Sequence, residues 1–125
     1  MTVLDTSVLI DSLSGPKRSA GALRAAIEKG ERILIPSLVL YEWLRGARLP
    51  AETTAQEALF PSESALVFGP REASLSAELY RSLKRPRGRE IDFAIAACAI
   101  VREAALWSLN KADFSDIPGL RLAMF

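Results

Sequence analysis

The sequence predicts an α/β fold with a mainly parallel sheet of four to five strands. Short apolar runs alternate along the chain with longer segments of helical periodicity, and Gly and Pro residues separate the two kinds of segment. The chain has 125 residues, half of them hydrophobic, which is enough to bury a core without disulfides or zinc. No repeat or change in composition marks a boundary, so we expect one domain over residues 1–125.

The elements follow from local signals. Strands are expected where apolar runs end at turn residues, namely over residues 2–4, 33–35, 65–68, 106–108 and, at the sheet edge, 120–124. Helices are expected over residues 8–13, 19–29, 37–48, 72–83 and 90–102. Pro36 can open the third of these helices, and Leu49-Pro50 closes it. Residues 51–64 allow no clear prediction.

The composition excludes several classes of chemistry. The chain has no His, so His-dependent acid–base catalysis and His-ligated zinc are impossible. Its one Cys, Cys98, lies in an apolar run and is expected to be a core residue. The apolar stretches are about half as long as a membrane span requires, and no basic leader precedes them, so we expect a cytoplasmic protein.

Four acidic residues stand in unusual surroundings. Asp5 and Asp113, with Asn110, follow predicted strands, and ligands of parallel sheets bind beyond those strand ends. Glu42 and Asp92 each interrupt the apolar stripe of a helix. Each acid has an ordinary alternative: Glu42 could pair with Arg45, Asp5 and Asp92 could serve helix N-termini, and Asp113 could be a turn residue.

All four acids are predicted at or near one edge of the sheet. Two carboxylates about 4 Å apart repel by about 4 kcal/mol at an effective dielectric constant near 20. Such a cluster must therefore take up protons, find basic partners or hold cations. Ligands that are all oxygen atoms favour Mg²⁺ or Mn²⁺ over zinc or copper.

Four motifs span nearly the whole chain: residues 3–10 (VLDTSVLI), Pro36-Ser37 with 41–47 (YEWLRGA), 91–97 (IDFAIAA) and 106–114 (LWSLNKADF). In this order they resemble the PIN-domain family, and most closely the VapC-type toxin ribonucleases of toxin–antitoxin systems. The resemblance implies a three-layer α/β/α domain. Leu109 departs from the family pattern, because relatives often have a basic residue there.

The resemblance also implies the site and the reaction. Asp5, Glu42, Asp92 and Asp113 would hold one or two Mg²⁺ or Mn²⁺ ions, with Ser7 and Asn110 as accessory polar residues. Asp116 could take the place of Asp113. A metal-activated water would hydrolyse RNA to 5′-phosphate and 3′-hydroxyl products. A cognate VapB-like antitoxin and a homodimer are implied as partners, the dimer using the apolar helix around Val39, Leu40 and Trp43.

A basic loop precedes Asp92. We expect Lys84, Arg85, Arg87 and Arg89 to bind RNA phosphates without regard to sequence, although a solvated loop would have the same composition. Trp43 and Trp107 are expected in the core or a dimer contact rather than as stacking platforms for bases. Two other functions remain open: a PIN-like module that binds RNA or a partner without cutting, and an aspartyl phosphotransferase with Asp5 as nucleophile.

Overall fold

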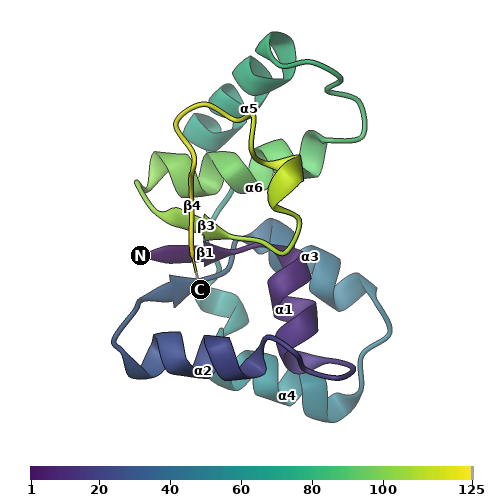
Figure 1. Cartoon of the computed structure of the whole chain (residues 1–125). Helices are drawn as coiled ribbons and strands as arrows, with labels where there is room; N and C mark the ends of the chain where they lie inside the picture. The colour runs from purple at the N-terminus through teal and green to yellow at the C-terminus, as the bar shows by residue number, and fades with distance from the viewer. Residues whose placement is uncertain (125) are drawn as a thin grey trace.

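The computed structural model describes residues 1–124, and over them the chain forms a wholly parallel sheet between two groups of helices (Figure 1). The strands lie in the order β2-β1-β3-β4, where β1 is Thr2–Leu4, β2 is Ile33–Leu34, β3 is Ala105–Trp107 and β4 is Arg121–Leu122. In the central pair, Val3 of β1 lies opposite Leu106 of β3, and both are fully buried. The predicted α/β class is confirmed, with four strands in the sheet of the described chain.

Helices cover both faces of this sheet. The structure contains α1 (Thr6–Leu13), α2 (Ala20–Glu28), α3 (Ser37–Arg45), α4 (Pro50–Leu59), α5 (Pro70–Ser82) and α6 (Glu90–Val101), with short 3₁₀ turns η1 (Ser62–Ser64) and η2 (Lys111–Asp113). In Figure 1, α5 and α6 lie on one side of the sheet and α1, α2 and α4 on the other, which is the expected three-layer arrangement. α3 contacts both α1 and α6.

The helix α6 is the centre of the core. Seven consecutive residues of this helix, Phe93–Ala99, are buried, because α5 packs on one side of it and β1 and β3 on the other. Four of the seven are Ala, whose small side chains let the helix approach both neighbours closely. The acidic N-terminus of this apolar helix is thereby held beside the ends of β1 and β3.

The expected strand at residues 65–68 is wrong. Only Leu66 pairs with the β2 side of the sheet, in an isolated parallel bridge to Pro36. The Leu66 amide donates to the Ile35 carbonyl at 2.9 Å, and the Ser37 amide donates to the Leu66 carbonyl at 2.8 Å. The pairing ends there because α3 begins at Ser37 and carries the partner chain away.

The expected helix end at Leu49-Pro50 is also wrong. α3 already ends at Arg45, and Pro50 is the first residue of α4, which lies in the stretch that gave no clear prediction. Proline is tolerated there because the first amides of a helix have no partner within the helix. The Glu52 carboxylate accepts a hydrogen bond from the Leu49 amide at 2.8 Å and so caps the N-terminus of α4.

The aromatic and sulfur side chains that the sequence singled out belong to the core. Trp43, Trp107 and Cys98 are all buried, and burial raises the pKa of the Cys98 thiol to about 11. Val39 and Trp43 are fully buried within this one chain, so neither belongs to the expected dimer surface, whereas Leu40 is half-buried. No helix in residues 1–124 has the length and hydropathy to span a membrane.

Truncating the central strand should destabilise the fold strongly. Leu106 is 0% exposed in β3, so we expect Leu106→Ala to lower the free energy of unfolding by about 2–5 kcal/mol. Leu44→Ala is the control, because Leu44 is 50% exposed and should cost less than about 1 kcal/mol. Urea titrations of both variants measure the difference. Equal losses would mean that the Leu106 side chain does not contribute to the core as its burial indicates.

Candidate active site

Asp5 lies at the point where β1 ends and α1 begins. Its amide donates to the Trp107 carbonyl at 2.9 Å, which ties it to the end of β3, and the residue is only 5% exposed. Its Oδ2 atom accepts hydrogen bonds from Ser7 Oγ at 2.9 Å and from Ser108 Oγ at 2.7 Å. Asp5 occupies the N-cap position of α1 without a side-chain capping bond, so capping does not explain this carboxylate.

The two serines are themselves fixed by backbone amides. Ser7 Oγ accepts from the Leu109 amide at 3.1 Å, and Ser108 Oγ accepts from the Asn110 amide at 2.9 Å. Each hydroxyl proton is thereby directed at Asp5. Ser108 was not among the predicted site residues, although it follows a buried strand directly, which is the signal that singled out Asn110.

Glu42 reaches the same region from α3. Its Oε1 accepts from Thr6 Oγ1 at 2.5 Å, and its Oε2 from Arg45 Nη2 at 3.3 Å. The predicted alternative, a pair with Arg45, is therefore present, but the Glu42 side chain is only 18% exposed and is also bonded to α1. Thr6 is a second site residue that the sequence reasoning missed, although it is the neighbour of Asp5.

Asp92 lies in the first turn of α6, and the charges of the other three acids act on its carboxyl. Burial, together with the charges of Asp5, Asp113 and Glu42, raises the pKa of its carboxyl to about 6, while Arg89 opposes them. A helix N-terminus by itself would favour the charged carboxylate. A role in capping alone therefore does not account for Asp92.

Asp113 and Asp116 are in different surroundings. Asp116 accepts two hydrogen bonds from Arg89, at 2.6 and 3.0 Å, and this pairing lowers the pKa of its carboxyl. Asp113, in η2, is exposed, and its carboxylate makes no hydrogen bond within residues 1–124. Asp113 is among the charges that raise the pKa of Asp92, whereas the Asp116 carboxylate is paired with Arg89, which favours Asp113 as the fourth acid. Asn110, just before η2, is exposed.

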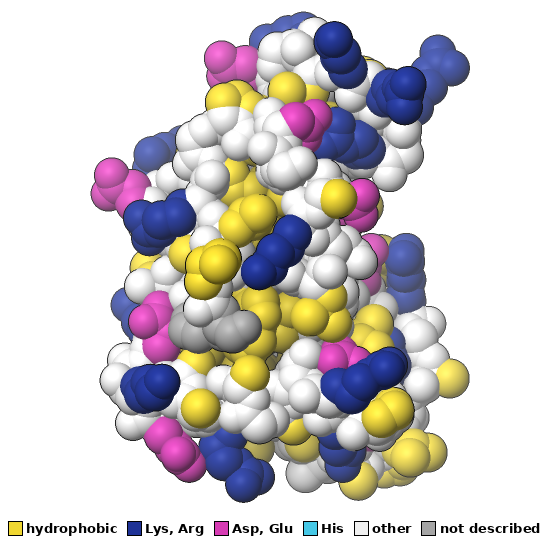
Figure 2. All heavy atoms as spheres, in the orientation of Figure 1, with side chains coloured by type: hydrophobic (Ala, Val, Ile, Leu, Met, Phe, Trp, Pro, Cys, Tyr) yellow, Lys and Arg dark blue, Asp and Glu magenta, His cyan; other side chains and the backbone are white. Residues whose placement is uncertain are grey.

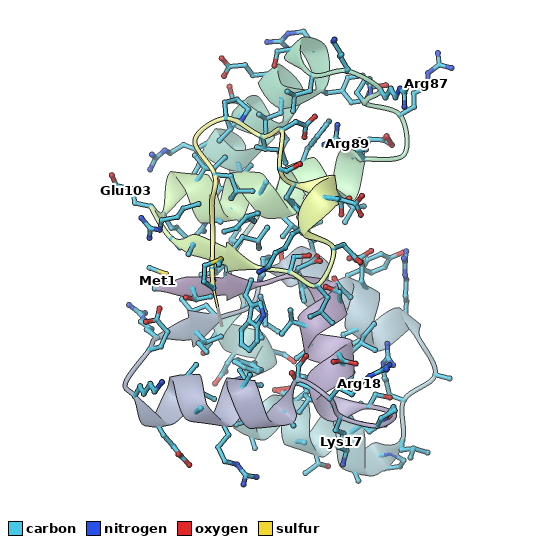
Figure 3. All side chains as sticks on the ribbon, viewed as in Figure 1. Met1, Lys17, Arg18, Arg87, Arg89 and Glu103 are labelled. Atoms are coloured by element: carbon cyan, nitrogen blue, oxygen red, sulfur yellow. The ribbon has the colours of Figure 1, made fainter. Side chains whose placement is uncertain are left out.

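The basic loop divides into two parts. Lys84, Arg85 and Arg87 are exposed, and in the described chain their side chains have no hydrogen-bond or ion-pair partner. Figure 3 shows Arg87 pointing away from the ribbon, whereas Arg89 points inward toward the C-terminal segment. Lys and Arg side chains gather over this end of the molecule in Figure 2. Arg89 is instead occupied by Asp116 and backbone carbonyls.

The family model that matches the chain is that of the PIN domain, over residues 2–120. The chain belongs to the PIN-domain family. It is 35% identical to Ribonuclease VapC19 of two Mycobacterium tuberculosis strains, over 97% of this chain and 98% of that protein. Among solved structures, DNA-bound VapBC from Salmonella typhimurium gives a TM-score of 0.78 at 25% identity, covering 98% of this chain and 96% of that one. Promoter-bound VapBC2 from Rickettsia felis gives 0.75 at 22% identity, with the same coverage.

The acids of this PIN domain match a hard divalent cation in donor type and charge. All four offer carboxylate oxygens, and burial together with the negative charge of the other three acids raises the pKa of Asp92 despite the neighbouring Arg89. As the side chains of residues 1–124 stand, no three acidic, His or Cys residues are arranged to hold a metal ion. The four acids thus fit a divalent cation in ligand type and charge, and their carboxylates would have to rotate in order to bind it.

The raised pKa of Asp92 predicts a pH-dependent stability effect. Between about pH 4 and pH 6 the folded protein binds more protons than the unfolded chain, so rising pH through this window destabilises the fold. In EDTA at pH 7 we expect Asp92→Asn to raise the free energy of unfolding by about 1–2 kcal/mol, after allowing for screening, and to change it little at pH 4.

Asp116→Asn is the control with the opposite sign. The pKa of Asp116 is lowered by Arg89, so this variant should lose stability at pH 7 rather than gain it. Urea titrations at both pH values compare the two variants with the wild type. A loss of stability in Asp92→Asn at pH 7 would contradict mutual repulsion among the four acids.

Proposed function

We propose that this PIN domain is a VapC-type endoribonuclease that hydrolyses RNA phosphodiester bonds in the cytoplasm with the help of Mg²⁺ or Mn²⁺. The observation that supports the proposal is that, in addition to burial, the charges of Asp5, Asp113 and Glu42 raise the pKa of Asp92, so the four acids act on one another. The named relative, a ribonuclease matched over nearly its full length, supports RNA as the substrate.

The chain's own residues have separate tasks in this reaction. Asp5 is held in one orientation by two hydroxyls, so it is a fixed metal ligand, and Glu42, Asp92 and Asp113 complete the set. When bound, the metal ion would lower the pKa of a water molecule and neutralise charge on the phosphate. Above pH 6 the Asp92 carboxylate is ionised and able both to bind the ion and to accept a proton at Oδ1 or Oδ2. Products with a 5′-phosphate and a 3′-hydroxyl are expected.

A protein partner is part of the proposal. The solved relatives are toxin–antitoxin assemblies, which supports a cognate VapB-like antitoxin for this chain. A largely apolar groove of about 810 Å³ between α1, α2 and α4, lined among others by Leu13, Leu23 and Leu59, offers surface for such a partner. For a homodimer, the exposed Tyr41 and Leu44 of α3 are available in place of the buried Val39 and Trp43.

The alternative is a PIN-like module that binds RNA or a partner without cutting. It is favoured by the arrangement of the carboxylates, no three of which, in residues 1–124, are placed to hold an ion. Catalysis and binding alone are separated by a cleavage assay.

Cleavage of RNA should need both the metal and the acids. We expect purified protein to cut a labelled mixture of structured RNAs with Mg²⁺ or Mn²⁺ and not with EDTA. Asp5→Asn and Asp92→Asn should lower the rate at least about 100-fold, because each removes a ligand charge. Glu63→Gln is the matched control, since Glu63 is exposed in η1 outside the site and should keep the wild-type rate. RNA binding without cutting by the wild type in every metal would support the binding module instead.

The exposed part of the basic loop should control RNA affinity. Replacing Lys84, Arg85 and Arg87 together by Gln removes three candidate phosphate contacts, so the slope of log KM against log salt should fall by about 2 with kcat unchanged. The control replaces three exposed basic residues away from the loop, Arg24, Lys29 and Arg32, by Gln. The same loss in both triple variants would mean that net charge, rather than this loop, binds the RNA.

A further inference from the structure

Arg89 is the most extensively bonded side chain near the four acids, although it lies in the basic loop. It stands at the N-cap of α6, three residues before Asp92, and its side chain is only 20% exposed. Nη1 donates to Asp116 Oδ2 at 3.0 Å and to the Lys84 carbonyl at 3.1 Å. Nη2 donates to Asp116 Oδ1 at 2.6 Å and to the Asp113 carbonyl at 3.0 Å.

These bonds leave little of Arg89 for a phosphate. Each terminal nitrogen of a guanidinium carries two protons, and all four here have an acceptor, so only the Nε proton remains. The Asp116 carboxylate also neutralises the charge in a bidentate pair. The guanidinium carbon lies 4.7 Å from the centre of the Phe93 ring, which covers one of its faces. Lys84, Arg85 and Arg87 have no such partners and stay available for RNA.

The same bonds join the segments that carry Asp92 and Asp113. Arg89 begins the helix of Asp92, and it holds the backbone of Asp113 through the carbonyl and the following turn through Asp116. The Asp113 carboxylate has no bond of its own in the described chain, and η2 is only three residues long. Phe114 and Ile117 are buried and anchor this segment in the core, but in the described chain neither forms a hydrogen bond with the Asp113 carboxylate.

We propose that Arg89 is a positioning residue, which with Asp116 holds Asp113 opposite Asp92, rather than an RNA contact. This assignment rests on the proposed nuclease function for its effect on rate, but not for its effect on local structure. Asp116 is then the anchor of Arg89 and not a fourth metal ligand. Loss of either partner would let η2 move relative to α6 and so misplace one ligand of the cation.

Two conservative variants separate positioning from RNA binding. Arg89→Lys keeps the positive charge but cannot bond four acceptors, and Asp116→Asn keeps the shape but loses the ion pair. A positioning role predicts that both variants lower kcat by about tenfold to about 100-fold with KM and its salt dependence nearly unchanged. Asp116→Glu, which can still pair with Arg89, should recover most of the rate. An RNA contact predicts instead that Arg89→Lys is nearly silent and that Asp116→Asn, by freeing Arg89, lowers KM.

A second readout is independent of catalysis. The amides of Asp113 and Phe114 donate to the Asn110 and Lys111 carbonyls at 3.0 and 3.1 Å, so their hydrogen exchange reports on η2. In EDTA, we expect both amides to exchange several-fold faster in Arg89→Lys and Asp116→Asn. Arg18→Gln is the matched control. It breaks the ion pair between Arg18 and Asp11, which lies far from Arg89 in Figure 3, so the exchange of the η2 amides should stay unchanged.

Unchanged exchange in both variants, or a change in KM alone, would overturn the assignment. If the wild-type protein cuts no RNA, the proposed function fails, and faster exchange of the two amides still supports Arg89 as the residue that holds η2. Faster exchange with an undiminished kcat in an active enzyme would overturn its role in placing Asp113.

Discussion

The burial of one carboxylate, that of Asp5, links the fold of this protein to its site. A carboxylate that is 5% exposed must be compensated by donors, because burying an unpaired charge is costly. Its donors are Ser7, from the start of α1, and Ser108, from the end of β3. These hydroxyls meet Asp5 only because β1 and β3 are adjacent and parallel and end at the same level. The order of the strands in the sheet therefore also fixes the position of the Asp5 carboxylate.

Glu42 and the segment that carries Asp113 are held by separate contacts with other elements. Glu42 is bonded to Thr6 of α1 and to Arg45 of its own helix, whereas the segment of Asp113 is tied to α6 through Arg89. Burial and the like charges of the other three acids raise the pKa of Asp92, so its ionisation destabilises the fold at neutral pH. In such a site, the free energy gained by packing the apolar core around α6 offsets the repulsion between the carboxylates.

The departures from the predicted elements have local causes. The run at 65–68 is apolar enough for a strand, but its partner turns into α3 at Ser37, so a single bridge is all that forms. α4 went unpredicted because its sequence is mostly polar and small, and Pro50 was interpreted as a stop when it is a start. In the site, Thr6 and Ser108 were missed because the role of a hydroxyl depends on the atom to which it is hydrogen-bonded, which the sequence does not show.

The sequence by itself determined the α/β class and the absence of His, and it singled out four acids as candidates, because these depend on residue type, periodicity and position relative to strand ends. Only the tertiary structure could show that the charge of Asp113 acts on Asp92, and that Arg89 is bound to Asp116 while Arg87 is exposed. The reason is physical, because two Asp residues, or two Arg residues, that lie near each other in the sequence have the same side-chain chemistry. Their roles differ only through the partners that folding brings to each, from segments such as η2 and α6 that are distant in the chain.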